Sequence, residues 1–331
     1  NATVWFRPDR LDIWVGTQNA TQVCHEAARV SGLDPANIHC HVTYLGGGFG
    51  RRGEMDFVRH ALAIAIAVPD TPVKVTWSRE EDTTHDVYRP PAVARMRGAV
   101  EGGLPIAYDL ACATASVVAS QRARDGGGTA GPDKTIVQAA WDQPYEISNY
   151  RVTGYRAGLD LPFGYWRSVG ASQNGFFHEC FLDELAALAD ADPVEMRLRL
   201  LDHEPSRRVL DTAAKRAGWG KPLPQGHARG VAFVLSFGVP AAEVVEIAQS
   251  PAGLRIVRVH AAVDVGIALD PGIIEAQVQS GIVFGLAAAI SGEITLNDGK
   301  VNQTNFHDFE PLRLHPAVSY THLRAHETPL H

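Results

Sequence analysis

The sequence predicts an α+β protein built from two domains. A chain of 331 residues exceeds the usual size of one hydrophobic core. Apolar residues recur at helical spacing in 21–30 and in 55–68. Residues 94–100 and 106–118 have the character of neighbouring strands of an antiparallel sheet.

In the N-terminal part, strands and helices alternate around one glycine-rich loop. A turn with the sequence LDPAN separates the first helix from the strand that precedes this loop. The elements expected here are a strand at 11–15, a helix at 21–30, a strand at 39–45, a helix at 55–68 and a strand at 73–77. The last three form a β-loop-α-β unit with the glycines in its loop.

Further along, the chain is predicted to complete one domain and begin another. The remaining strands of the first domain are expected at 94–100, 106–118 and 150–158, and its helices at 176–189 and from Asp192 onward. Those of the second domain are expected at 231–235, 244–248, 255–264 and 292–296, with a helix at 274–290. We predict a first domain at 1–203, a linker at 204–229, a second domain at 230–316 and a non-native tail at 317–331.

Composition and charge exclude several classes of protein. A net charge of −7 argues against general affinity for nucleic acid, so any anion site must be local. The 4 cysteines contain no C-x-x-C pair, which argues against a metal cage or a disulfide framework. His39 and His41 share a strand face without a third partner, and we predict no zinc site there. We find no apolar run of the roughly 18 residues that a membrane span needs.

The loop YLGGGFGRRG at 44–53 allows two interpretations, a dinucleotide-binding site or a tight turn. Gly48, Gly50 and Gly53 satisfy G-x-G-x-x-G between a strand and a helix, the pattern of an NAD- or FAD-dependent oxidoreductase. However, two arginines lie inside the motif, and the acids after the second strand, at 80–82, follow the loop by about 30 residues instead of about 20. The structural alternative is a tight turn whose arginines face solvent.

Six blocks of sequence together resemble one enzyme family. They are WVGTQNATQ, YLGGGFGRR, VKVTWSREEDTTHDVYRP, YWRSVGASQNGFFHECFLDELA, AAVDVGIALDPGIIEAQVQSGIVFGLAAAISGEIT and QTNFHDF. In this order they resemble the molybdenum-binding subunit of the xanthine dehydrogenase family, in particular isoquinoline 1-oxidoreductase beta subunits and related aldehyde oxidases. The resemblance extends from about residue 1 to about residue 316.

The resemblance implies a fold and a cofactor. The fold would be that of molybdopterin-binding domains, with mixed sheets and packed helices. The cofactor would be a molybdopterin, in its cytosine dinucleotide form, whose own sulfurs hold the molybdenum without a protein ligand. Backbone amides unshielded by Cβ atoms can donate to oxo ligands and phosphates. The positions implied are Gly47, Gly48, Phe49 and Gly50, with the Phe49 amide directed at an oxo group.

Three further side chains are implied by the resemblance. Arg167 in YWRSVG corresponds to an arginine near the metal centre, where a guanidinium can hold oxygen atoms. Gln277 in AQVQSG corresponds to a pterin-contacting glutamine, although Gln279 stands where the family motif has an acid. Arg89 in VYRPP lies near the position of a substrate-pocket arginine, and its alternative role is that of a turn residue.

The block with Thr17 and Gln18 also resembles a family block. We interpret these two residues as packing residues.

The implied reaction is hydroxylation of an electrophilic carbon in an N-heterocycle or an aldehyde, with oxygen from water. Electrons would leave through a small partner subunit that carries 2Fe-2S clusters. The family's general-base glutamate belongs to a GEPG-like motif that this chain lacks, so no catalytic residue is expected here. We expect segments to be missing at both ends and the chain alone to be inactive. A catalytically silent scaffold of the same fold is the other alternative, and the compartment, cytoplasmic or periplasmic, stays open.

Overall fold

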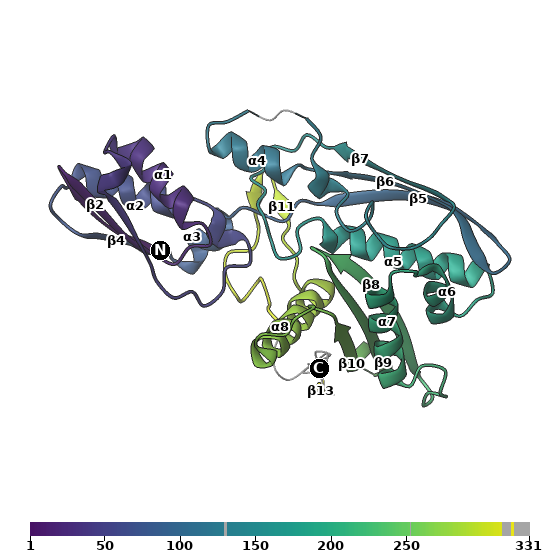
Figure 1. Cartoon of the computed structure of the whole chain (residues 1–331). Coiled ribbons are helices and arrows are strands. Elements are labelled where there is room, and N and C mark those ends of the chain that lie inside the picture. The colour runs from purple at the N-terminus through teal and green to yellow at the C-terminus, as the bar shows by residue number, and fades with distance from the viewer. Residues whose placement is uncertain (129–130, 252, 313–318, 321–331) are drawn as a thin grey trace.

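The computed structural model describes residues 1–128, 131–251, 253–312 and 319–320. Three sheets of three or four strands carry helices packed against them, and a small two-stranded hairpin lies apart (Figure 1). This arrangement confirms the predicted α+β class.

The N-terminal sheet has four strands in the order β3-β2-β1-β4 and is covered by two helices. Its strands are β1 (Ala2–Arg7), β2 (Arg10–Val15), β3 (Ile38–Val42) and β4 (Val73–Val75); the helices are α1 (Ala20–Ser31) and α2 (Asp56–Ala67). β1 and β2 pair antiparallel, whereas β2 and β3 pair in parallel. The predicted β-loop-α-β unit is confirmed as β3, the glycine-rich loop, α2 and β4.

The middle sheet consists of β5, β6 and β7, with a long helix across one face. Its strands are β5 (Ala92–Glu101), β6 (Leu104–Thr114) and β7 (Asn149–Arg156), and the helices that follow β6 and β7 in the chain are α4 (Val117–Arg124) and α5 (Ala171–Leu188). The short helix α3 (Arg79–Thr84) precedes β5 in the chain. The strand predicted to run through residue 118 ends at Thr114, because Ser116 accepts a hydrogen bond from the Ala119 amide and caps α4. The helix predicted at 176–189 begins earlier, at Ala171.

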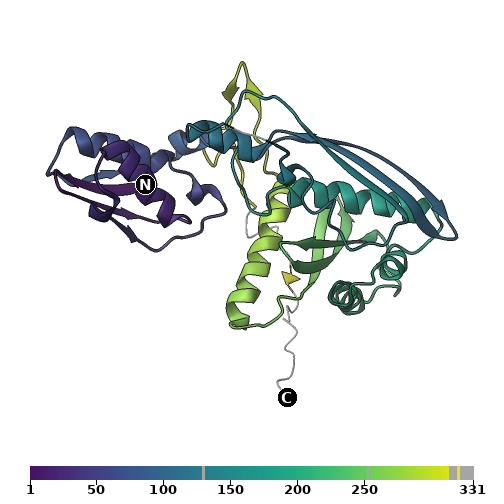
Figure 2. The ribbon, with the colours of Figure 1, turned by 45° about the horizontal axis from the view of Figure 1, so that its top comes forward.

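The third sheet holds the C-terminal half and has a helix on each face (Figure 2). Its elements are β8 (His227–Ser236), β9 (Val239–Ser250), β10 (Gly253–Val263), β13 (Ser319–Tyr320), α7 (Glu204–Ala217) and α8 (Pro271–Ile290). The other elements are α6 (Pro193–Leu200), β11 (Leu296–Asn297), β12 (Lys300–Val301) and the short helices η1 (Pro35–Asn37), η2 (Arg51–Gly53) and η3 (Lys134–Ile136).

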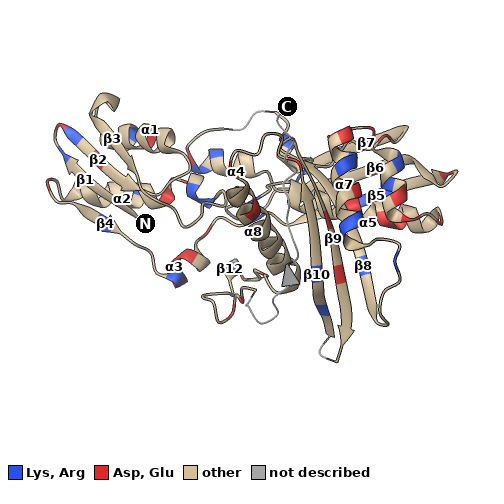
Figure 3. Ribbon diagram, turned by 60° about the horizontal axis from the view of Figure 1, so that its bottom comes forward, with Lys and Arg blue, Asp and Glu red and all other residues tan. Residues whose placement is uncertain are grey.

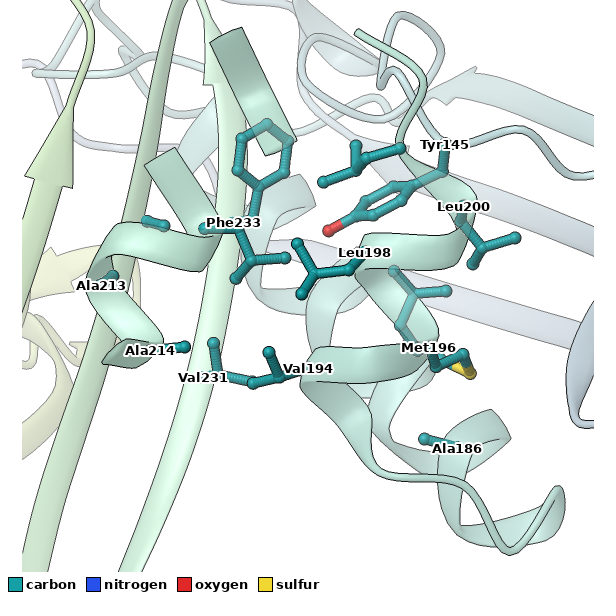
Figure 4. Packing of buried hydrophobic residues seen from close by; sticks show 14 of the residues in the cluster. Tyr145, Ala186, Val194, Met196, Leu198, Leu200, Ala213, Ala214, Val231 and Phe233 are labelled. Atoms are coloured by element: carbon teal, nitrogen blue, oxygen red, sulfur yellow. The ribbon is translucent and has the colours of Figure 1, made fainter. Parts of the chain in front are cut away.

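The segment predicted as a linker, 204–229, is not one. It contains α7, whose Val209, Leu210 and Ala213 are buried in the same cluster as side chains of α5, α6 and β8. Figure 4 shows Ala213 and Ala214 in this cluster beside Val231. The polar residues that suggested a linker lie on the solvent side of an amphipathic helix. Of the predicted tail, 317–331, only Ser319 and Tyr320 lie within the described residues.

A buried ion network ties α5, α6 and β8 together. Arg197 has no exposed surface and donates from Nε to Glu179 at 2.9 Å and from Nη1 to Asp183 at 2.7 Å. Glu179 also accepts a hydrogen bond from the Phe233 amide of β8 at 2.8 Å. Burial alone would raise the pKa of Glu179, but the charge of Arg197 and these hydrogen bonds keep it below its ordinary value. The Glu179 carboxylate therefore connects α5 and α6 with β8 of the third sheet.

α8 corrects one expectation from the sequence. It is 20 residues long with a mean hydropathy of 1.6, which is enough by length and composition for a membrane span, and only 6% of that window is buried. The sequence shows no uninterrupted apolar run here, because Glu275, Gln277 and Gln279 divide the apolar residues of this helix. In Figure 3, α8 is almost uniformly tan, whereas α7 carries blue and red bands. One side of α8 packs on β9 and β10 through Ile282.

Candidate functional site

Three segments that are distant in sequence meet in the structure. They are the glycine loop, residues 46–53; the arginine turn, residues 165–170; and α8. The Phe49 ring stacks on Phe284 of α8, with centroids 5.6 Å apart and planes 9° apart. Arg167 reaches the same helix, donating from Nη1 to Ser280 Oγ at 2.9 Å and from Nη2 to the Gln277 carbonyl at 2.8 Å. The structure thus brings together the predicted residues Phe49, Arg167 and Gln277.

The glycine loop has a backbone that few other residues could adopt. Gly47, Phe49 and Gly50 have φ values of 144°, 51° and 89°. A Cβ at Gly50 would lie 1.9 Å from the Tyr165 carbonyl oxygen, and a Cβ at Gly48 would lie 2.4 Å from the Gln18 side chain. Contacts below 3.0 Å require a backbone or side-chain shift. Gly50 therefore lets the glycine loop touch the arginine turn.

Among the backbone amides of this loop, that of Gly50 donates a hydrogen bond to a side chain, whereas several others have no acceptor within the described residues. The Gly50 amide donates to Gln18 Oε1 at 3.0 Å. Across the described part of the chain, the amides of residues 46–49 donate no hydrogen bond. Residues 46, 47 and 49 are exposed, so these donors can reach a ligand. A run of free amides in a turn is a concave donor set suited to anionic oxygens. The loop therefore fits a cofactor that presents oxo or phosphate oxygens.

The two arginines of the loop are directed into the protein. Arg51 pairs with Asp56 at 2.7 Å and also with Asp86, and its side chain is 11% exposed. Arg52 donates from Nε to the Gly16 carbonyl at 2.8 Å and lies over the Phe57 ring. Burial and the neighbouring Arg51 lower the pKa of Arg52. These arginines fasten the loop, and the alternative of a turn with solvent-facing arginines is wrong.

The G-x-G-x-x-G segment does not have the geometry of a dinucleotide site. Such a site joins parallel strands to a helix whose N-terminus receives the pyrophosphate. Here β3 and β4, the strands on either side of the loop and α2, lie at opposite edges of the sheet. Residues 51–53 form the short helix η2, and α2 begins only at Asp56 after the buried Met55. An acid in the first turn also opposes a pyrophosphate at that position.

Arg167 forms no ion pair with a carboxylate among the described residues. Its two hydrogen bonds go to a hydroxyl and a carbonyl of α8, so the charge is not neutralised locally. Gln277 contributes its carbonyl to this contact, while its side chain is exposed. Gln279, which replaces an acid of the family motif, donates to Glu275 at 3.1 Å. Arg167 therefore brings a positive charge, without an ion-pair partner among the described residues, to the contact between the arginine turn and α8.

Arg89 lies behind the arginine turn and contacts its backbone. Its Nη2 donates to the Arg167 carbonyl at 2.9 Å, and its Nη1 donates to Ser172 Oγ at 2.8 Å and to the Val169 carbonyl at 3.3 Å. Burial lowers the pKa of Arg89. Its substrate role stays a prediction, and the structure adds a contact that the sequence did not indicate.

The sequence indicates a packing role for Gln18, and the structure gives it a second role at the site. Its Oε1 holds the Gly50 amide, and its side chain is exposed beside Gly48. The position of Gln18 in the sequence could have indicated that it lies beside the glycine loop. β2 and β3 are parallel neighbours, so the loops that follow Val15 and Val42 leave the same sheet edge. Gln18 lies on the first of these loops and the glycine loop follows the second.

No carboxylate among the described residues bonds to the free amides of residues 46–49 or to Arg167. The acids closest in sequence are engaged elsewhere: Glu54 with Arg124 at 2.8 Å, and Asp56 with Arg51. A general base for proton removal therefore has no candidate in the contacts of this site. The expectation that this glutamate lies outside the chain stays a prediction.

Comparison with known proteins gives a consistent match over the whole chain. Two families, both described as molybdopterin cofactor-binding domain, match residues 1–201 and 199–315. The beta chain of isoquinoline 1-oxidoreductase from Brevundimonas diminuta is 31% identical over 96% of this chain and 41% of its own length. The membrane-bound aldehyde dehydrogenase [pyrroloquinoline-quinone] of Gluconacetobacter polyoxogenes is 26% identical over 100% of this chain and 47% of its own length.

The fold is also similar to that of a solved structure. Quinoline 2-oxidoreductase from Pseudomonas putida 86 superposes with a TM-score of 0.79 at 14% identity, covering 99% of this chain and 67% of that chain. The present chain spans less than half the length of the two curated relatives described above. With the two domain matches and the 31% identical relative, the chain belongs to the molybdopterin cofactor-binding family of xanthine dehydrogenase and aldehyde oxidase large subunits.

Proposed function

We propose that this chain is the cofactor-binding part of a molybdenum hydroxylase large subunit that oxidises an N-heterocycle or an aldehyde with water-derived oxygen. One observation carries the proposal: the glycine loop, whose amides at 46–49 donate no hydrogen bond within the described residues, contacts α8 through the Phe49 ring, and Arg167, which has no carboxylate partner there, contacts the same helix. Amides and a guanidinium are the donors that oxo, phosphate and pterin oxygens need.

The residues of this chain would share the work of holding the cofactor. Gly47, Gly48 and Phe49 would donate amide hydrogens to it, and Gly50 lets the loop pack against the arginine turn. Arg167 would contribute positive charge, and Gln277 would contact the pterin from α8. Gln18 keeps the loop in its donor conformation through the Gly50 amide. When bound, the cofactor would supply the two-electron redox chemistry of the hydroxylation.

The substrate class and the electron partner are inferred from relatives. Two relatives, an isoquinoline 1-oxidoreductase and a nicotinate dehydrogenase, are named for N-heterocycles, and each is named as one subunit of its enzyme. Another relative is an aldehyde oxidoreductase molybdenum-binding subunit. We therefore infer a small-molecule substrate of one of these classes, a cytosine dinucleotide form of the cofactor, and a small partner subunit with 2Fe-2S clusters.

The proposal is tested on the full-length protein purified with its partner subunit. We expect about one molybdenum and one pterin per large subunit, with cytidine monophosphate released on acid hydrolysis. Turnover of an aldehyde or an N-heterocycle in ¹⁸O-labelled water should place the label in the product. Stoichiometric flavin, nicotinamide or pyrroloquinoline quinone without molybdenum would contradict the proposal. Molybdenum present without turnover of either class would instead favour the silent scaffold.

A further inference from the structure

The arginine turn contains two consecutive residues in a conformation that neither favours. Ser168 has φ of 67° and Val169 has φ of 46°. Left-handed backbone is uncommon for any residue with a Cβ and is a marked outlier for a β-branched one such as valine. Such a conformation persists only where surrounding contacts hold it. The contacts that hold this turn are therefore worth identifying residue by residue.

Arg89 supplies several of these contacts from one planar group. Its guanidinium donates to the carbonyls of Arg167 and Val169 on either side of Ser168 and to Ser172 Oγ at the start of α5. A guanidinium presents its donors in a fixed fork, so it fixes the relative positions of the oxygens that it binds. Within the described residues Arg89 pairs with no carboxylate, so its contacts with the turn are not shared with an acid.

The chain segment that carries Arg89 is itself fastened to the strand-like stretch before the turn. The Tyr88 amide donates to the Pro162 carbonyl at 2.9 Å, and the Gly164 amide donates to the Tyr88 carbonyl at 3.1 Å. Trp166 Nε1 donates to the Val87 carbonyl at 2.7 Å. Arg89 is thus placed by a short ladder of hydrogen bonds and acts on the turn from a fixed position.

The cavity that Arg89 lines is too small for a substrate. Its volume is about 10 Å³, and its other walls include Thr114, Trp166 and Gln173. A space of this size holds at most one water molecule. The Oε1 atom of Gln173 is buried there without a hydrogen-bond partner among the described residues, so a water would have an acceptor to bind. The guanidinium therefore faces the turn and a water-sized space.

We propose that Arg89 is a positioning residue: it holds the left-handed turn at 168–169 and so aims Arg167 at Ser280 and the Gln277 carbonyl of α8. The proposal rests on the proposed function in one respect, that Arg167 faces the cofactor. It assigns Arg89 an indirect action through the backbone, in place of direct contact with the substrate. Loss of the fork would let the turn relax and move the Arg167 guanidinium away from α8.

The test compares Arg89→Lys with wild type in the full-length protein with its partner subunit. Lysine keeps the charge but cannot bind the turn carbonyls as a fork. We expect kcat to fall about 100-fold with KM changed less than about 2-fold, because small misplacement of a site group costs that much. Adding Val169→Gly, which removes the left-handed penalty, should restore kcat at least about 10-fold. A raised KM with unchanged kcat and no rescue would assign Arg89 to the substrate and overturn the proposal.

A second measurement does not depend on the proposed function. Amide hydrogen exchange of the peptide covering 166–174 should speed up about 10-fold in Arg89→Lys, while a peptide from β5 stays unchanged. The matched control is Arg95→Lys, an exposed arginine on β5, which should leave both peptides and kcat unchanged. Unchanged exchange at 166–174 would overturn the positioning role even if the wild-type protein contained no molybdenum. Absence of molybdenum with accelerated exchange would reject only the proposed function.

Discussion

Replacing Gly50 by alanine is expected to abolish molybdenum incorporation into the full-length protein. The new Cβ would lie 1.9 Å from the backbone carbonyl oxygen of Tyr165, and a backbone carbonyl cannot swing aside as a flexible side chain can. The φ of 89° adds strain for any residue with a Cβ. Together these effects cost about 2 to 4 kcal/mol and push the glycine loop away from the arginine turn. We expect less than about a tenth of the wild-type molybdenum content by elemental analysis.

Gly53→Ala is the matched control for this variant. Gly53 lies in the same loop, but its added Cβ would meet no atom within 4 Å, and its φ is not in the left-handed region. It should keep wild-type molybdenum content and thermal stability. If Gly50→Ala retained full molybdenum while Gly53→Ala behaved like wild type, the close approach of loop and turn would have no part in cofactor binding.

Replacing Arg167 by alanine is expected to lower turnover strongly. The variant loses the hydrogen bonds to Ser280 and to the Gln277 carbonyl, and it removes the one guanidinium that lies between the arginine turn and α8 in the described residues. Removing a preorganised donor from a site of developing charge typically lowers kcat by about 100-fold to 1000-fold. We expect a kcat loss in this range at comparable molybdenum content, or loss of molybdenum itself. Steady-state kinetics together with elemental analysis separates these two results.

Arg95→Ala is the control, because it removes an exposed arginine on β5 without touching the site. It should leave kcat, KM and molybdenum content unchanged. A fully active Arg167→Ala enzyme with normal molybdenum content would remove Arg167 from the site and leave only the glycine loop to support the proposal.

The features that the sequence predicted correctly are those with local causes. Apolar residues at helical spacing mark α1 and α2, and the strands predicted at 11–15, 94–100 and 150–158 are found as β2, β5 and β7. The glycine loop was found because four glycines in five positions of a short segment have few purely structural explanations. Its convergence with Arg167 on α8 was reached through the family resemblance, since no local pattern connects residues more than 100 apart.

The features that were missed depend on contacts across the chain. The segment 204–229 resembles a linker because it is polar and contains prolines, and the burial of the α7 alanines follows from packing against β9, β10 and the other elements of the same cluster. Gln18 was assigned to packing because its partner, the Gly50 amide, lies 32 residues away. Arg89 was assigned to the substrate by position alone, and its contact with the Arg167 carbonyl spans 78 residues. Side-chain roles of this kind depend on tertiary contacts, and no periodic pattern in the sequence indicates them.

The most direct test of the central claim is the position of the metal in crystals of the full-length protein. Anomalous scattering at the molybdenum absorption edge locates that atom independently of any assumption about the pterin. We predict a single strong peak beside the amides of residues 47–50 and Arg167, on the side where Phe284 of α8 stacks against Phe49. A molybdenum peak distant from these residues, or none in an active enzyme, would contradict the account.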